Sequence, residues 1–224
     1  MIEIRNITKT RMFKSILKDC TCTIDRGKVI GIIGENGSGK TTFLQVLAGV
    51  FKQDKGTINL PNDRSESIAY SPDQEYFYNY FTIEQLMDYY QSQFGDFDRK
   101  KAEQLIDFFE LKRNEKINYL SKGQVGRVKI AATIARNAPL LLLDEPLAGL
   151  DPLVKDKIIK GLLQFVNMET QTLLITTHEL LEIETILDEV IVMKAGCMIA
   201  QENVDVIREE QSVQKWFQKV YQKK

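Results

Sequence analysis

Short apolar runs, each followed directly by polar residues, recur along the chain at residues 29–33, 140–143 and 172–177. Runs of this length that are rich in aliphatic side chains are typical of strands buried on both faces of a parallel sheet. Residues 2–24 instead alternate between apolar and polar positions and end at a turn sequence at residues 25–27, which predicts antiparallel strands. Further short strands are expected at residues 56–60 and 67–71.

After residue 75 the apolar positions change to a helical period. Leu86 and Met87 fit one helix, and Leu105 and Ile106 fit another. We therefore expect an inserted helical region over about residues 75–137, between strands of the main sheet, within an α/β fold. No linker or repeat divides the 224 residues, so the whole chain is expected to form one domain.

A glycine-rich stretch, Gly34-Glu35-Asn36-Gly37-Ser38-Gly39-Lys40-Thr41, separates the strand expected at 29–33 from a helix expected at 41–48. In this context the G-x-x-x-x-G-K-[ST] pattern forms a phosphate-binding loop, because glycine lets backbone N–H groups face an anion. Lys40 would then bridge the β- and γ-phosphates of a nucleotide, and the Thr41 hydroxyl would bind Mg²⁺. The alternative is a glycine turn with a solvated lysine. It is disfavoured because the strand expected before the loop and the helix expected after it both fit a phosphate-binding loop.

Chemically active residues follow the other two buried strands. Asp144 and Glu145 come directly after residues 140–143, and His178, the single histidine, comes after residues 172–177. Taken singly, an acidic pair after a strand often lies in a solvated loop, and a lone histidine is more often a structural residue than a catalytic one. Because ligands of open α/β sheets bind beyond the carboxyl ends of the strands, we expect these residues to share one site with the phosphate loop.

The composition excludes several classes of protein. A net charge of −1 gives no general attraction to nucleic acid, so no nucleic-acid partner is expected. The N-terminal residues lack the apolar core of a signal peptide, and no apolar run reaches the length of a membrane span, so we expect a cytoplasmic protein. Three cysteines are too few for a disulfide framework, and Cys20 and Cys22 are expected to be small core residues on one face of a strand.

The stretch Leu120-Ser121-Lys122-Gly123-Gln124, about twenty residues before Asp144, resembles the signature sequence of ATP-binding cassette (ABC) proteins. With residues 148–152 (Ala-Gly-Leu-Asp-Pro) after the acids and Thr177-His178 later, the order of motifs is similar to that of an ABC transporter ATPase subunit over nearly the whole chain. The resemblance implies a P-loop NTPase core with a mixed, largely parallel sheet. It also implies an N-terminal antiparallel β subdomain and an inserted α-helical subdomain.

The resemblance further implies roles for individual residues of the phosphate loop and the acidic strand. The residues expected to bind ATP here are Gly34, Glu35, Asn36, Gly37, Ser38, Gly39, Lys40, Thr41 and Thr42. Asp144, together with Thr41, resembles the groups that organise Mg²⁺. Glu145 resembles the general base and His178 the switch histidine at the γ-phosphate, and with Lys40 these two make up the expected catalytic residues.

In the family, the signature sequence contacts a nucleotide that the other subunit holds. Ser121, Gly123 and Gln124 are therefore expected to complete the ATP site of a second ABC subunit, because the N-terminus of a helix favours phosphate. Asp151 resembles the loop aspartate that links the two subunits. The resemblance thus implies a homodimer or a heterodimer.

Three positions depart from the family pattern. Lys122 stands where glycine is usual. The loop that usually contains proline and glutamine reads Pro72-Asp73-Gln74, so either Asp73 or Gln74 has that role beside the metal. Arg11 stands where an adenine-stacking tyrosine is common; Arg11 itself could stack as a guanidinium plane, and Phe13 is the alternative.

These features predict an ATP-binding and ATP-hydrolysing subunit, with Mg²⁺ as cofactor, that powers transport by a separate transmembrane permease at the cytoplasmic face of the membrane. One alternative is a soluble ABC-type ATPase that acts on a non-transport partner. Another is a module that binds ATP without hydrolysis, against which Glu145 argues. Five aromatic residues within 76–81 predict a partner surface, with Tyr78 and Tyr80 expected to be exposed.

Overall fold

The computed structural model describes residues 1–60, 63–74 and 76–223. The strands are β1 (Ile2–Arg11), β2 (Lys14–Ile24), β3 (Val29–Ile33), β4 (Lys55–Asn59), β5 (Ile68–Ser71), β6 (Leu140–Asp144), β7 (Thr172–Thr177), β8 (Glu189–Lys194) and β9 (Cys197–Asn203). The helices are α1 (Lys40–Leu47), α2 (Arg64–Ser67), α3 (Ile83–Gln93), α4 (Arg99–Phe108), α5 (Lys122–Ile134), α6 (Pro152–Phe165), α7 (Val204–Glu210) and α8 (Val213–Lys223). Short 3₁₀ helices span Ile117–Tyr119, Leu180–Glu182 and Glu184–Ile186.

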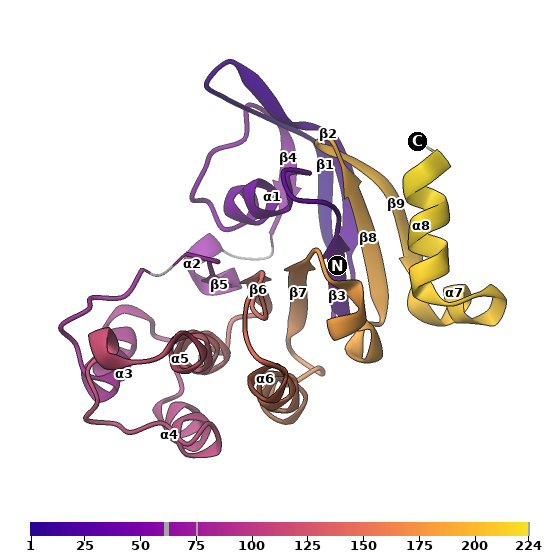
Figure 1. Ribbon diagram of the computed structural model, residues 1–224. Coiled ribbons are helices and arrows are strands. Elements are labelled where there is room, and N and C mark those ends of the chain that lie inside the picture. The colour runs from indigo at the N-terminus through magenta and orange to yellow at the C-terminus, as the bar shows by residue number, and fades with distance from the viewer. Residues whose placement is uncertain (61–62, 75, 224) are drawn as a thin grey trace.

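Within the described residues the strands form two sheets (Figure 1). The main sheet has the order β5-β6-β7-β3-β8-β9, in which every neighbouring pair is parallel except β8 and β9. The second sheet, β2-β1-β4, is antiparallel. This arrangement confirms the predicted mixed, largely parallel sheet with an N-terminal antiparallel sheet.

The main sheet separates two hydrophobic cores. Leu140 and Leu142 of β6 belong to the core that contains Phe43 of α1 and the inner face of the antiparallel sheet. Leu141 and Leu143 belong to the core formed with α3, α4, α5 and α6 on the opposite face. Because successive side chains of a strand point to opposite faces, a continuous apolar run buries both faces of the sheet, as the sequence predicts.

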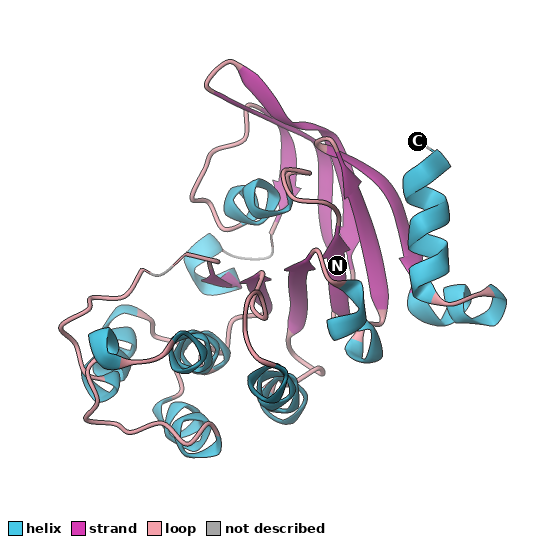
Figure 2. Cartoon of the chain, in the orientation of Figure 1, coloured by secondary structure: helices cyan, strands magenta, loops and turns pink. Residues whose placement is uncertain are grey.

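The helices α3, α4 and α5 follow β5 in the chain and precede β6. Figure 2 shows them gathered on one side of the molecule, where α5 packs against β5 at the edge of the main sheet. Thr82 and Ser121 begin α3 and α5 with capping boxes, in which the side chain and backbone of each cap exchange hydrogen bonds with a glutamine three residues later. Residue 75, where the sequence predicts the start of this helical region, lies outside the described residues.

The cysteines of β2 lie in the core. Cys20 and Cys22 are both buried and pair across the antiparallel sheet with Ile7 and Ile4, as expected for small core residues. Burial raises the pKa of the Cys20 thiol to about 11 and that of Cys22 to about 12, so both remain protonated and unreactive at neutral pH. Among the described helices, none is long and apolar enough to cross a membrane.

Candidate functional site

The glycine-rich loop joins the end of β3 to the first residue of α1. Gly37 and Gly39 have φ angles of 80° and 107°, in the left-handed region that side chains disfavour. A Cβ atom at Gly34 would collide with the main-chain carbonyl of Met193, which explains the requirement for glycine there. The loop therefore places the N-terminal N–H groups of α1, which begins at Lys40, at the edge of the sheet where an anion is favoured.

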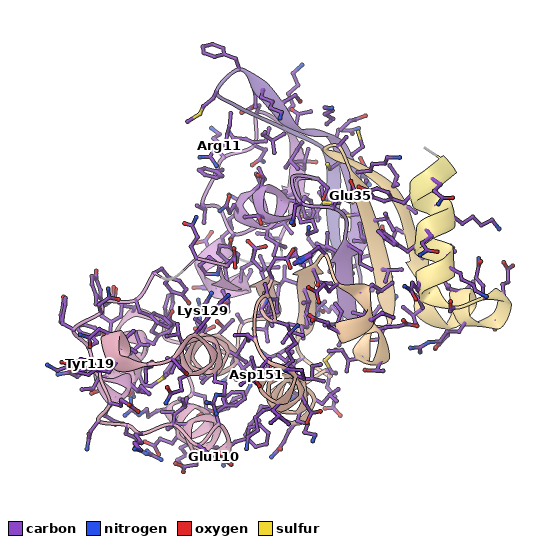
Figure 3. The ribbon with its side chains drawn as sticks, in the orientation of Figure 1. Arg11, Glu35, Glu110, Tyr119, Lys129 and Asp151 are labelled. Carbon is purple, nitrogen blue, oxygen red and sulfur yellow. The ribbon has the colours of Figure 1, made fainter. Side chains whose placement is uncertain are left out.

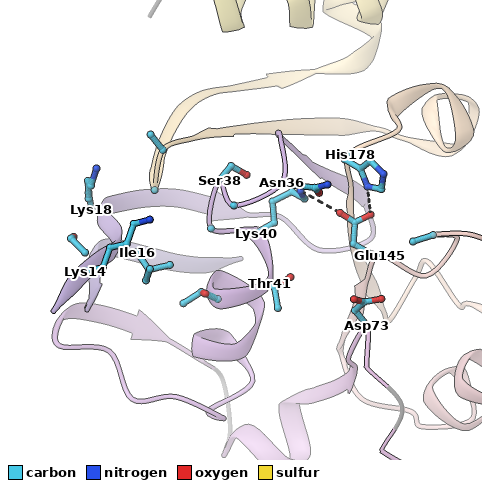
Figure 4. A pocket seen from close by; sticks show the side chains of 17 residues that line it. Lys14, Ile16, Lys18, Asn36, Ser38, Lys40, Thr41, Asp73, Glu145 and His178 are labelled. Atoms are coloured by element: carbon cyan, nitrogen blue, oxygen red, sulfur yellow. Dashed lines mark hydrogen bonds and ion pairs between the residues drawn. The ribbon is translucent and has the colours of Figure 1, made fainter. Parts of the chain in front are cut away.

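A cavity of about 650 Å³ lies over this loop (Figure 4). Asp73, Glu145 and His178, which follow β5, β6 and β7, line it together with the loop and α1. The other lining residues are Lys14, Ser15, Ile16, Lys18, Asn36, Gly37, Ser38, Gly39, Lys40, Thr41, Thr42, Ala148, Ala195 and Gly196. The structure thus brings the predicted phosphate loop, Glu145 and His178 to one cavity, because β6, β7 and β3 are neighbours whose carboxyl ends meet at one edge.

Lys40 is held against its own loop. Its side chain is only 5% exposed, and Nζ donates hydrogen bonds to the carbonyl oxygens of Gly34 at 2.8 Å and Glu35 at 3.3 Å. The same ammonium lies 3.3 Å from Oε1 of Glu145. Lys40 is therefore a nearly buried cation whose partners are carbonyl oxygens and one carboxylate, and a phosphate group could replace them.

Asp144 is 1% exposed and is not among the residues that line the cavity, but its carboxylate bonds to Thr41, which is. Its Oδ1 atom accepts hydrogen bonds from the hydroxyls of Thr176 at 2.7 Å and Thr41 at 3.0 Å, and Tyr70 donates to Oδ2 at 3.3 Å. Burial raises the pKa of Asp144, while the hydroxyl donors act in the opposite direction. Burial and the neighbouring Asp144 raise the pKa of the Tyr70 hydroxyl well above its usual value.

This arrangement fits a magnesium ion. Mg²⁺ prefers oxygen ligands and is commonly held by one or two carboxylates, with phosphate and water oxygens completing the shell. The Thr41 hydroxyl and the Asp144 carboxylate supply two such oxygens side by side. The part of the chain that the structure describes contains no cluster of three or more metal-binding side chains, and a site completed by a nucleotide does not need one.

Glu145 connects the cation of the loop to the histidine. Its Oε2 atom lies 2.9 Å from Nδ1 of His178, and its Oε1 atom faces Lys40 (Figure 4, dashed lines). The backbone N–H of Glu145 donates to the Thr176 hydroxyl at 2.9 Å. Glu145 has a φ angle of 47°, a left-handed conformation that is uncommon for a residue with a side chain.

The signature residues lie outside this cavity. Ser121 caps α5, since its Oγ atom accepts from the Gln124 N–H at 3.3 Å and its own N–H donates to Oε1 of Gln124 at 2.9 Å. Neither these two residues nor Gly123 lines the cavity of their own chain. Asp151 caps α6 by accepting from the Val154 N–H at 3.1 Å (Figure 3). Their expected contacts with a second subunit remain predictions.

The loop after β5 distinguishes between Asp73 and Gln74. Asp73 lines the cavity that also contains Glu145, whereas Gln74 is not among its lining residues. The backbone carbonyl of Asp73 accepts a hydrogen bond from Lys129 of α5 at 2.8 Å, which joins this loop to the helical region. Of these two residues, Asp73 is the one that lines the cavity, and its contact with a metal remains a prediction.

The residues expected to stack on adenine do not line the cavity. The guanidinium carbon of Arg11 lies 4.6 Å from the centre of the Phe51 ring (Figure 3), and Phe13 is fully exposed at the turn between β1 and β2. The cavity is instead lined on this side by residues of β2, including Ile16 and Lys18. The sequence did not indicate these residues, because β2 reaches the cavity through long-range contacts, such as the 2.8 Å hydrogen bond from the Lys18 N–H to the Gly196 carbonyl, that no local pattern specifies.

Comparisons with known proteins agree with this geometry. The family model described as ABC transporter matches residues 17–148. The ABC transporter ATP-binding protein YtrB of Bacillus subtilis (strain 168) is 30% identical over 217 residues, which cover 94% of this chain and 74% of YtrB.

Two solved structures share the fold. The ATP-binding subunit of an ABC transporter superposes with a TM-score of 0.87 at 23% identity and covers 99% of both chains. The dimeric, post-hydrolysis structure of the ATP-binding cassette MJ0796, bound to ADP and Pi, has a TM-score of 0.80 at 26% identity and covers 91% of this chain and 98% of that one. From the matched family model and the 30% identity to YtrB over 94% of this chain, we conclude that the chain belongs to the ABC transporter family.

Proposed function

We propose that this protein is the ATP-binding and ATP-hydrolysing subunit that powers transport by a separate membrane-spanning partner. The observation that carries the proposal is the carboxylate of Glu145, held between Lys40 and His178 at the edge of a phosphate-loop cavity. The alternative is a soluble ABC-type ATPase with a non-transport partner. The description of YtrB as an ABC transporter ATP-binding protein favours the transport subunit.

Nucleotide phosphates would bind over the N-terminus of α1. The loop N–H groups and Lys40 would bind the β- and γ-phosphates, and Lys40 would exchange its bonds to Gly34 and Glu35 for phosphate oxygens. Thr41 and Asp144 would hold Mg²⁺, which neutralises phosphate charge when bound. The side chain of Asp73 faces the same cavity and would stand near this group.

Hydrolysis requires a base that can accept a proton from the attacking water. Glu145 has that role in the proposal, because it lines the cavity and because its two present partners, Lys40 and His178, would bind phosphate oxygens once ATP is present. His178 would donate a hydrogen bond to the γ-phosphate and orient Glu145 through Nδ1. The 2.9 Å backbone bond from Glu145 to Thr176 fixes the position of the base relative to Asp144.

A second ABC subunit is part of the proposal. Ser121, Gly123 and Gln124 form a capped helix N-terminus that does not reach the cavity of its own chain. Such a terminus favours an anion, and the phosphate of a partner's ATP is a suitable one. The MJ0796 cassette, which this chain resembles, forms a dimer bound to ADP and Pi.

The surface proposed for the membrane partner is the aromatic segment that precedes α3. Tyr78 and Tyr80 are exposed by 49% and 66%, while Phe77 and Phe81 pack against the core. A second cavity, of about 330 Å³, lies between Tyr76–Tyr78 and α3. Exposed aromatic side chains beside a cavity are typical of protein interfaces. Bound in this way, the protein would lie at the cytoplasmic face of the membrane through its partner.

The test is hydrolysis of Mg·ATP by the purified chain and by Glu145→Gln, with phosphate release and nucleotide binding measured separately. We expect the variant to retain ATP binding and to lose hydrolysis by about 10²- to 10⁴-fold, the contribution typical of a general base. Lys40→Ala serves as the comparison, because it should weaken binding itself. Unchanged turnover in Glu145→Gln would reject Glu145 as the base.

A further inference from the structure

The helix α8 packs against β8 beside the phosphate loop. Figure 1 shows it next to β8 and β9, and its residues Trp216 and Phe217 pack, partly buried, against the core that also contains α3 to α6. Tyr221 lies four residues after Phe217, on the same face of the helix, with 5.2 Å between the two ring centres. The packing of α8 therefore sets the position of Tyr221.

Lys194, the last residue of β8, holds the end of α8 in place. Its Nζ donates a hydrogen bond to the Tyr221 carbonyl at 2.6 Å and lies 4.9 Å from the centre of the Tyr221 ring. The last carbonyl groups of a helix have no partner within the helix, so a lysine beside them is favourable. One ammonium thus fixes both the backbone and the ring of this tyrosine.

The hydroxyl of Tyr221 meets Glu35, the second residue of the phosphate loop (Figure 3). Burial raises the pKa of Tyr221, a hydrogen bond with the Glu35 backbone lowers it, and the Glu35 carboxylate raises it. A donor favours the charged phenolate and an anion disfavours it. The hydroxyl oxygen therefore accepts from the backbone of Glu35, while its proton is directed to the carboxylate.

Glu35 is a fixed point of the phosphate loop. Its carbonyl oxygen accepts hydrogen bonds from the Ser38 N–H at 3.1 Å and from Nζ of Lys40 at 3.3 Å. Neither Glu35 nor Tyr221 is among the described residues that line the cavity. Tyr221 thus contacts the loop from outside the cavity and leaves the space for a nucleotide open.

We propose that Tyr221 is a positioning residue for nucleotide binding: its hydroxyl holds Glu35, and α8 thereby keeps the phosphate loop in the conformation that binds phosphate. The inference rests on the proposed function, since it concerns the affinity of the same loop for nucleotide. A loop that is already ordered loses less conformational entropy on binding, which raises its affinity. Because coupling between two sites is reciprocal, a bound nucleotide must also hold α8 more firmly in place.

Tyr221→Phe isolates the hydroxyl, because the ring can keep its contacts with Lys194 and Phe217. We expect this variant to bind Mg·ADP about two- to tenfold more weakly in isothermal titration calorimetry, the range that corresponds to one hydrogen bond. Tyr80→Phe is the matched control, since it removes an exposed hydroxyl from the segment before α3, and its Kd should equal that of the wild type. An unchanged Kd in Tyr221→Phe would overturn the proposal.

Hydrogen exchange of residues 213–223, measured by mass spectrometry, tests the reciprocal effect. Mg·ADP should slow this exchange in the wild type and slow it less in Tyr221→Phe. Exchange in α4 is the internal reference, because a ligand that stabilises the whole fold slows exchange there as well. Equal slowing of α8 by ADP in the two proteins would show that the hydroxyl does not connect α8 to the loop.

These measurements separate positioning from stability. If Tyr221→Phe lowers the melting temperature of the nucleotide-free protein but leaves Kd and the exchange difference unchanged, Tyr221 contributes only to folding stability and the positioning role is wrong. If the wild type itself binds no Mg·ADP, the proposed function fails, and this inference fails with it. Wild-type binding that Tyr221→Phe matches rejects this inference alone.

Discussion

The hydroxyl of Thr176 forms hydrogen bonds to both acids of the site, and Thr176→Val should show how much these two bonds contribute to stability and hydrolysis. The side chain is fully buried, accepts a hydrogen bond from Glu145 N–H at 2.9 Å and donates one to Asp144 at 2.7 Å. Valine has the same shape but makes neither bond. An unpaired buried N–H and a lost bond to a carboxylate together should lower the free energy of unfolding by about 2 to 5 kcal/mol.

For a chain of this size, that loss corresponds to a melting temperature lower by roughly 4 to 20 °C. Because Glu145 loses its backbone anchor, we also expect kcat for ATP to fall by about 10- to 100-fold, as slight misplacement of a catalytic group does. Loss of the Thr176 donor should raise the pKa of Asp144 further, since that bond favours the charged carboxylate.

The matched control is Thr133→Val, another buried threonine. Its hydroxyl donates to the Lys129 carbonyl within α5 at 2.8 Å, and we expect Thr133→Val to lower the free energy of unfolding by no more than about 1 kcal/mol. Thermal denaturation and steady-state phosphate release measure both effects. Equal destabilisation by the two substitutions, or an unchanged kcat in Thr176→Val, would refute the role of this hydroxyl.

Two further predictions concern partners. With ATP bound, Glu145→Gln should associate into dimers that light scattering detects. The double variant with Ser121→Arg should stay monomeric, because arginine adds bulk and charge at the N-terminus of α5. If Glu145→Gln is a monomer as well, the second subunit must be a different ABC protein. Serine at Tyr78 and Tyr80 should leave ATPase activity of the isolated chain within about twofold while transport with the membrane partner is lost, because these side chains are exposed. Equal loss of stability and hydrolysis in the Tyr78 and Tyr80 variants would place the cluster in the core.

Much of the fold follows from local pattern. The runs at 29–33, 140–143 and 172–177 are strands in the structure because each is apolar on both faces, and a parallel sheet covered by helices buries both. Ser121 and Gln124 are spaced as a capping box, and they begin α5. Such features depend on residues within a few positions of one another, so the sequence alone is sufficient to predict them.

The convergence of Lys40, Glu145 and His178 is also predictable, because residues that follow neighbouring parallel strands meet at the same edge. The sequence does not state that β6 lies beside β7 and β7 beside β3. The distances between these groups required the structure. In particular, no pattern indicated that Thr176, within an apolar strand, bonds to both acids.

The sequence by itself determined the buried strands at 29–33, 140–143 and 172–177, the phosphate loop, the capped start of α5 and the acidic pair that follows β6, since each depends on local spacing. Only the tertiary structure decided that Asp73 and not Gln74 lines the cavity, that Arg11 packs on Phe51, and that Glu145 lies between Lys40 and His178. Each of these depends on the register or relative placement of segments far apart in the chain. Those placements result from the packing of two cores against one sheet, which no local pattern contains.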